Sequence, residues 1–246
     1  MKITIVNMKE RPDLAHEFSA IGLQVWPEFV YHEPVVDEFL PRFFTDFPEF
    51  QLLALDNDEV ALGYARAIGI NWDGQINSLP KGWSDAIVSA FANIDRNGSV
   101  SALCAVSAGV APLHQGKGVG RALIAAMSSA ARGAALHFFV APVRPTSKAL
   151  YPLTPMERYV QWTRPDGSPF DPWIRSHHQA GGTLLHVCPQ SMTIRGTTED
   201  WEAWTGMYFP ESGPYIVPGA LVPIQIDIAS NVGAYIEPNV WFQHPL

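Results

Sequence analysis

Residues 110–121 have the sequence Val-Ala-Pro-Leu-His-Gln-Gly-Lys-Gly-Val-Gly-Arg, and this stretch decides the expected fold. The small and apolar run from Ser99 to Val110 predicts a buried strand, and the alanine-rich run from Ala122 to Arg132 predicts a helix. Three glycines within five residues let the backbone come close to a ligand, because glycine adopts positive φ without strain. The unpaired N–H groups at the start of the helix, together with its dipole, favour a pyrophosphate at this loop.

Two other glycine-rich nucleotide-binding motifs do not fit. A Walker A loop requires glycine at position 111 and serine or threonine after Lys117, where the chain has Ala111 and Gly118. A dinucleotide-binding fingerprint requires glycine at position 121, where the chain has Arg121. The remaining alternative to a ligand site is a glycine-rich connection between a strand and a core helix.

The stretch resembles the acyl-CoA motif of the GCN5-related N-acetyltransferase (GNAT) superfamily. That motif has Val-x-Pro at a strand end, followed by Gln/Arg-x-x-Gly-x-Gly/Ala at a helix start. The resemblance implies that backbone groups near the strand end hold the pantetheine arm and that the loop amides bind the diphosphate. The cofactor-binding residues expected from it are Val110, Pro112, Gln115, Gly116, Lys117, Gly118, Val119, Gly120 and Arg121.

The resemblance also implies an activity. It predicts an acyl-CoA-dependent N-acyltransferase, with acetyl-CoA as the expected donor, that acts on a small-molecule amine by direct transfer through a tetrahedral intermediate. No metal is expected. The alternatives are an O-acyltransferase, a hydrolase or a decarboxylase on the same fold, and a non-catalytic CoA-binding module. A protein substrate is less favoured, because an aromatic loop and a proline-rich segment suggest a closed pocket.

The order of predicted elements fits the same superfamily: a strand, two helices, three strands, the motif helix, a strand, a helix and closing strands. The first of the helices is expected from residue 11 to about residue 24, and strands are expected at 51–55 and 183–187. A helix expected at 83–94 is additional to the minimal pattern of the superfamily. We therefore expect an α/β (α+β) fold with a mixed, mostly antiparallel twisted sheet of about seven strands flanked by helices. The whole chain, residues 1–246, is predicted to form one domain. The proline-rich segment 142–172 is predicted to be an ordered insertion, because so many prolines exclude one regular element.

The residues that move protons are less certain from the sequence than the loop. In many GNAT enzymes a glutamate on the strand before the motif is the base, but residues 99–110 contain no acid. In many relatives a tyrosine four residues before a Gly-Phe pair protonates the thiolate, and that position falls on His177, before Gly181. We expect His177 or the adjacent His178 to act as an acid, with Glu33 as a candidate base. For each histidine the alternative is packing on a helix face, and for Glu33 it is a helix-start residue.

Acceptor contacts in this superfamily usually come from the first two helices and the last strands. The aromatic loop 26–34 lies between the first two predicted helices. Core packing is an equally good interpretation of its rings, and segment 142–172 could line the acceptor site or act as a structural flap. The substrate-contact residues predicted on this basis are Trp26, Phe29, His32 and Tyr151. Weaker candidates are Tyr31, Arg144, Tyr159, Trp162, Asp171, Trp173, Tyr235, Glu237 and His244.

Composition narrows the class of protein. With 47% hydrophobic and 16% charged residues, the chain is expected to be a folded globular protein. A net charge of −8 argues against a nucleic-acid partner. Two distant cysteines predict neither a disulfide framework nor a zinc site. No apolar run predicts a membrane span and no leader is recognised, so a cytoplasmic protein is expected, and a homodimer is left open.

Overall fold

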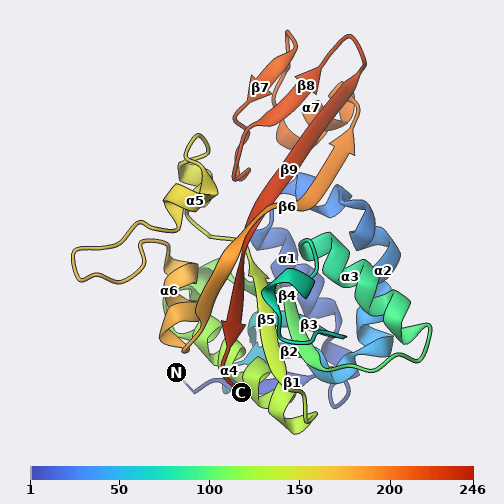
Figure 1. The fold of residues 1–246 in the computed structure, drawn as a ribbon, viewed down its shortest axis with the longest axis vertical. Coiled ribbons are helices and arrows are strands. Elements are labelled where there is room, and N and C mark those ends of the chain that lie inside the picture. The colour runs from blue at the N-terminus through green and yellow to red at the C-terminus, as the bar shows by residue number, and fades with distance from the viewer. Residues whose placement is uncertain (1) are drawn as a thin grey trace.

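The computed structural model describes residues 2–246, and nine strands of this range belong to one mixed sheet (Figure 1). The sheet therefore has two strands more than the approximately seven expected. In chain order the strands are β1 (Thr4–Asn7), β2 (Gln51–Leu55), β3 (Ala61–Ile70), β4 (Ala102–Val110), β5 (Phe138–Val143), β6 (Thr183–Gly196), β7 (Gly213–Tyr215), β8 (Ile224–Asp227) and β9 (Val232–His244).

The strand order in the sheet is β1-β2-β3-β4-β5-β9-β8-β7, and β6 pairs with β9 off this path. Only β4 and β5 run parallel, and the other recorded pairs are antiparallel. The predicted mixed, mostly antiparallel sheet is confirmed. The parallel pair is joined through the helix that follows the glycine loop, as a parallel connection requires.

Seven α-helices lie among the described residues. The predicted helix at 83–94 has the observed bounds, whereas the helix predicted from residue 11 is divided into a 3-10 turn (Pro12–Leu14) and α1. The helices are α1 (His16–Val25), α2 (Pro34–Asp46), α3 (Trp83–Ile94), α4 (Val119–Gly133), α5 (Met156–Tyr159), α6 (Pro172–Gln179) and α7 (Thr198–Thr205). None of the helices in residues 2–246 is both long and apolar enough to cross a bilayer.

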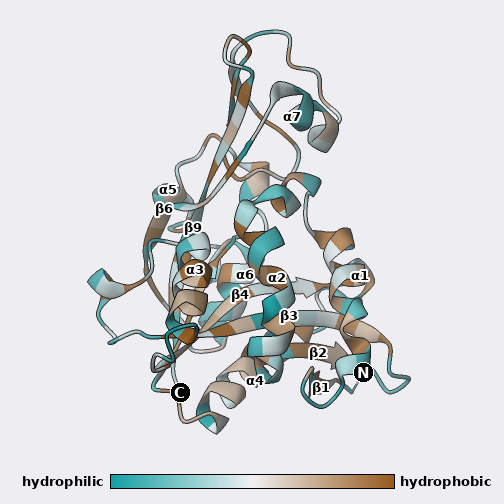
Figure 2. Ribbon diagram, turned by 90° about the vertical axis from the view of Figure 1, so that its right-hand side faces the viewer, coloured by the Kyte–Doolittle hydropathy of each residue, from teal (hydrophilic) through white to brown (hydrophobic). Residues whose placement is uncertain are grey.

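Helices cover both faces of the sheet. A Cβ added at Gly63 on β3 would lie 3.1 Å from Val119 of α4, so Gly63 faces α4. The next residue, Tyr64, packs against Phe18 of α1, so it faces the opposite side. Helices α2 and α3 contact each other on this second side, and Figure 2 looks onto α1, α2 and α3. The main core is the apolar layer between the central strands and these helices.

Strands β6 and β9 form a long ribbon that extends away from the body and carries β7, β8 and α7 at its far end (Figures 1 and 2). A smaller core around Trp201 and Tyr235 fills this end. The sequence predicted only residues 183–187 of β6 as strand. The strand continues to Gly196 because its pairing with β9 shifts register between Cys188 and Met192, which accommodates Pro189.

The proline-rich segment 142–172 is held by one buried aspartate. Asp171 accepts hydrogen bonds from the Tyr159 hydroxyl (2.8 Å) and from the Ser147 amide (2.8 Å), and its Oδ1 also caps the first turn of α6. The aromatic rings of Tyr151, Tyr159, Trp162 and Phe170 pack against one another beside it. This segment is an ordered aromatic cluster, and its prolines prevent a continuous strand or helix.

Candidate active site

The sheet opens between β4 and β5. These strands pair over only three positions, from Ala102 opposite Phe138 to Cys104 opposite Val140, although β4 continues to Val110. On its other side β4 has an extra residue, Val106, between the partners of Arg66 and Ala67, which is a β-bulge. The bulge carbonyl accepts a hydrogen bond from the indole Nε1 of Trp83 (2.5 Å). On the β5 side, residues of β4 after Cys104 therefore face a gap and not a paired strand, whereas on the other side they remain paired with β3.

A cavity of about 130 Å³ passes through this gap. Its walls come from both faces of the sheet: Met127 of α4 and His177 of α6 on one side, and residues of α1, α2 and α3 on the other. The only acidic side chain among its described lining residues is Glu237. Two groups of different chemistry can therefore enter from opposite faces and meet beside β4.

The glycine loop lies at one mouth of the gap. Gly116 and Gly118 have φ of +72° and +87°, and a Cβ added at either would meet no atom within 4 Å. No side chain caps α4, and within residues 2–246 no hydrogen bond is recorded from the amides of residues 116–121. These free N–H groups, the dipole of α4 and the exposed side chains of Lys117 and Arg121 suit an anionic group.

One line of contacts connects this loop to the cavity. A Cβ added at Gly120 would lie 2.8 Å from the indole of Trp173, and this indole meets the ring of His177 edge-on with 4.6 Å between centroids. The Nδ1 of His177 shares a hydrogen bond with the Nε2 of His244 (2.8 Å). Burial, and secondarily the nearby His244, lowers the pKa of His177 well below 6.5, so the ring is neutral at neutral pH. Its Nε2 has no partner among the described residues.

Polar aromatic side chains line the cavity on the α1 side. The indole Nε1 of Trp26 donates to the Tyr64 hydroxyl (2.7 Å), which also hydrogen-bonds Ser107 of β4 (3.2 Å). The hydroxyl of Tyr31 and the Nε of Arg66 are buried here without any recorded partner. This wall consequently offers hydrogen-bond donors that the protein itself does not use.

The third wall is a buried ion pair. The Nε of Arg144 donates to both carboxylate oxygens of Glu237 (3.0 and 2.9 Å). Glu237 also accepts from the Tyr235 hydroxyl (2.8 Å) and from the Asn239 amide (3.1 Å). With both oxygens engaged and the Glu237 side chain fully buried, this carboxylate holds β9 to the β5 end and is not free to act as a base.

Sequence comparison identifies the family. The model of the acetyltransferase (GNAT) family matches residues 15–154, which include the strand gap and the glycine loop. The chain belongs to the GNAT family of acetyltransferases. It is 32% identical to the arginine N-acetyltransferase avaD of Aspergillus versicolor over 263 residues, covering 95% of this chain and 88% of that protein.

Two solved structures have the same fold as this acetyltransferase over nearly their full length. One is the loading GNATL domain of CurA from Lyngbya majuscula (15% identity, TM-score 0.60, 99% of this chain and 98% of that chain). The other is the GphF GNAT-like decarboxylase in complex with isobutyryl-CoA (18% identity, TM-score 0.60, with the same coverage). At this level of identity they show a shared overall fold.

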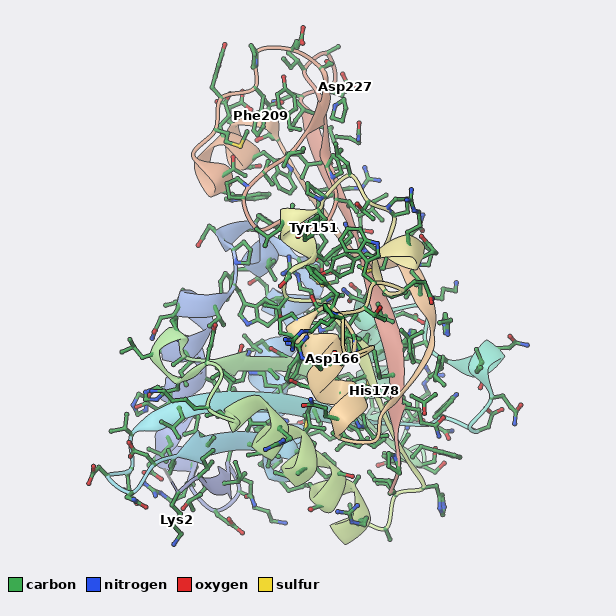
Figure 3. All side chains as sticks on the ribbon, turned by 90° about the vertical axis from the view of Figure 1, so that its left-hand side faces the viewer. Lys2, Tyr151, Asp166, His178, Phe209 and Asp227 are labelled. Atoms are coloured by element: carbon green, nitrogen blue, oxygen red, sulfur yellow. The ribbon has the colours of Figure 1, made fainter. Side chains whose placement is uncertain are left out.

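In this acetyltransferase, several residues predicted for the site lie away from the cavity. Glu33 is buried, accepts from the Val35 amide (2.7 Å) at the start of α2 and from the Ser84 hydroxyl (2.7 Å), and so serves as a helix cap. Phe29 packs on Trp201 in the ribbon core, and His32 stacks on Trp204. His178, labelled on α6 in Figure 3, is exposed, and Tyr151, also labelled, belongs to the aromatic cluster of segment 142–172.

Other predicted residues do come together at the gap. Trp26, Tyr31, Arg144, Trp173, Glu237 and His177 all line the cavity, and the loop residue Gly120 lies beside the indole of Trp173. Two further residues of the site have an unsatisfied polar atom. His244, the hydrogen-bond partner of His177, was only a minor candidate from the sequence, and Arg66 was not predicted at all. The signal for Arg66 was available, because it is an isolated charge within the otherwise apolar strand of residues 61–70.

Proposed function

We propose that this acetyltransferase transfers the acetyl group of acetyl-CoA to the amine nitrogen of a small molecule. The amine nitrogen forms a C–N bond to the acetyl carbonyl carbon, and the C–S bond breaks. One proton of the amine ends on the departing sulfur, so that the products are an amide and free CoA. The substrate amine must be neutral at the moment of attack, which requires a group that accepts a proton directly or through water.

The observation that carries this proposal is the row of unused amides from Gly116 to Arg121. A pyrophosphate is a suitable partner, because it supplies several acceptors to donors that no side chain satisfies. The open space above Gly116 and Gly118 leaves room for such a group to approach the backbone. Bound there, acetyl-CoA supplies an activated acyl carbonyl, and the gap beside β4 gives its thioester end a path into the sheet.

A small acceptor is favoured over a protein acceptor by the cavity. It lies within the molecule, under α1, α2 and α3, and most of its lining residues are apolar or aromatic. A flexible peptide would need an open groove across these helices. The relative named an arginine N-acetyltransferase supports an amine of amino-acid size as acceptor.

His177 is the side chain we assign to proton transfer. Its ring is neutral, and its Nδ1 shares one hydrogen with His244. When the Nδ1 of His177 holds that hydrogen, its Nε2 is bare and accepts a proton only by forming a buried cation, which its depressed pKa disfavours. In the tautomer with hydrogen on Nε2, His177 donates toward the cavity instead. The second arrangement suits protonation of the departing sulfur.

The test combines product analysis with a pair of neighbouring variants. Purified protein is incubated with acetyl-CoA and a panel of amino acids and polyamines, and thiol release and N-acetyl products are followed by thiol titration and mass spectrometry. We expect an N-acetylated product, a loss in kcat of about 10²–10⁴-fold for His177→Gln, and no loss for the exposed His178→Gln. Acetyl-CoA hydrolysis without an acetylated product, or equal activity of both variants, would contradict the proposal.

A further inference from the structure

Arg66 is a half-buried cation without an anionic partner among the described residues. It lies on β3 opposite Ser107 of β4, next to the bulge, and lines the cavity. Its guanidinium makes no hydrogen bond and no ion pair with any residue of 2–246, and its Nε is completely shielded from solvent. A charged side chain in such a place is costly unless another group pairs with it, and here the protein supplies none.

Aromatic rings enclose this guanidinium but do not satisfy it. Its carbon atom lies 5.1 Å from the ring centroid of Tyr64, 5.3 Å from that of Phe18 and 5.7 Å from that of Phe44. These cation–π contacts hold the charge in position, and no hydrogen bond to a described residue is recorded for the guanidinium N–H groups. Burial lowers the pKa of Arg66, yet a guanidinium keeps its proton in proteins, so the charge stays.

A second unused donor lies in the same wall. The Tyr31 hydroxyl is buried without a partner, and burial raises its pKa to about 12, which keeps it a neutral donor. A Cβ added at Gly22 would be 3.0 Å from this hydroxyl and 3.7 Å from that of Tyr64, so both hydroxyls converge over Gly22. The absence of a side chain at Gly22 is what leaves space beside them.

We propose that Arg66 and Tyr31 form an anion subsite that binds the carboxylate of the acceptor, so that the acceptor is an amine that also carries a carboxylate, such as an amino acid. The inference rests on the proposed function and narrows its substrate class. A carboxylate suits these donors because its two oxygens match the guanidinium fork while one of them also accepts from the hydroxyl. The subsite lies on the α1 face, and the loop of residues 116–121 lies on the α4 face, so the two anions are held apart by the sheet.

The first experiment compares acids with their own amides. L-Arginine, L-lysine and L-phenylalanine are each tested against the corresponding amino-acid amide, both for acetylation with acetyl-CoA and for thermal stabilisation of the protein without it. We expect at least one acid to exceed its amide about 10- to 100-fold in kcat/KM, the loss typical of a charge-assisted hydrogen bond. Equal turnover of acids and amides would overturn the subsite and leave the proposed function intact.

The thermal-stability measurement separates the carboxylate subsite from the proposed acetyltransferase function. If no amine is acetylated, the proposed function fails, but an acid that stabilises the free protein when its amide does not would still support the carboxylate subsite. If no acid stabilises the protein more than its amide and no acid is preferred in turnover, the subsite is refuted. Malonyl-CoA alone is also tested, because the carboxylate that binds Arg66 and Tyr31 could belong to the acyl group and not to the acceptor. Arg66-dependent decarboxylation of malonyl-CoA would overturn its assignment to the acceptor.

The melting temperature of the free protein distinguishes a ligand-binding arginine from one that stabilises the fold. Arg66→Met removes an uncompensated, half-buried cation and keeps a side chain of similar length, so we expect the free protein to melt at a higher temperature. The same change is expected to abolish the preference for acids through a higher KM, and Arg66→Lys to restore part of it. Arg164→Met, at an exposed arginine, is the matched control and should change neither property.

An Arg66→Met protein that folds but melts at a lower temperature, or that folds and keeps the preference for acids, would contradict the inference. Tyr31→Phe provides an independent variant if the first does not fold. It removes only the unpartnered hydroxyl, so we expect normal stability with a several-fold smaller preference for acids. An unchanged preference in Tyr31→Phe would exclude Tyr31 from the subsite.

Discussion

The role of the glycine loop can be tested by adding a single methyl group at Gly118. This residue precedes α4 with φ of +87° and ψ of 0°, in the left-handed region. Any residue with a Cβ is strained there by about 1–2 kcal/mol. No protein atom lies within 4 Å of the added Cβ, so Gly118→Ala introduces backbone strain and no clash. The unfolding free energy should fall by this amount while the fold persists.

The effect on ligand binding should be larger than the effect on stability. The strained backbone can relax only by turning the peptide groups on either side of residue 118, and these groups carry amides that the pyrophosphate would use. Losing one hydrogen bond to a charged group costs about 1.5–3 kcal/mol. We therefore expect the Kd for acetyl-CoA, measured by isothermal titration calorimetry, to rise about 10- to 100-fold.

Gly133 offers a matched control for this substitution. It is the last residue of α4, is not at positive φ, and also has no atom within 4 Å of an added Cβ. Gly133→Ala should keep the Kd of the parent and should not lose stability, because alanine favours the helix. S-acetylpantetheine, which lacks the diphosphate, should bind equally to the parent and to Gly118→Ala. An unchanged Kd for acetyl-CoA in Gly118→Ala would refute the role assigned to these amides.

Three further predictions concern buried ionisable groups. Glu33→Ala should lower the unfolding free energy by about 0.5–2 kcal/mol, the value of a helix cap, with kcat unchanged in steady-state assays; a large loss of kcat would restore its role as a base. Glu237→Gln should destabilise by about 3–5 kcal/mol in denaturant titrations, because it leaves Arg144 buried without its counter-ion, and a neutral effect would contradict this view of the pair. Burial lowers the pKa of His244 to about 4, so the unfolded chain binds a proton between pH 6.5 and 4 that the native chain does not. The unfolding free energy should therefore fall by about 3 kcal/mol from this group as the pH drops through that window, and His244→Phe should flatten the profile.

The features that the sequence predicts well depend on local rules. The glycine loop is recognisable because positive φ at Gly116 and Gly118 and the following helix start are properties of neighbouring residues. Strand 51–55 and helix 83–94 have their predicted bounds for the same reason, since each is a short periodic segment between clear turn residues. His177 was located by its distance from Gly181, which is also a local relation.

The features that the sequence does not predict depend on partners far along the chain. Strand β6 continues beyond the predicted end at residue 187, and only its pairing with β9 shows that a register shift accommodates Pro189. Glu33 fits both a base and a helix cap in sequence. In the structure one of its oxygens accepts from the Val35 amide and the other from the hydroxyl of Ser84, which is distant in the chain. The significance of Arg66 likewise appears only when no acidic side chain is found beside it.

The distribution of unsatisfied donors explains how two negatively charged ligands could react in one protein. Free amides are exposed on the α4 face, and the unused donors of Arg66 and Tyr31 face the cavity on the α1 side, so each anion would have its own set of donors. The sheet lies between the two sets of donors, and in the proposed reaction the amine and the thioester would meet at the gap between β4 and β5. Glu237, the acidic residue recorded at the cavity, is neutralised by Arg144 and repels neither ligand. Because binding to the native state stabilises it, acetyl-CoA and a carboxylate acceptor should each raise the melting temperature, and a ligand that lacks its anion should raise it less at the same concentration.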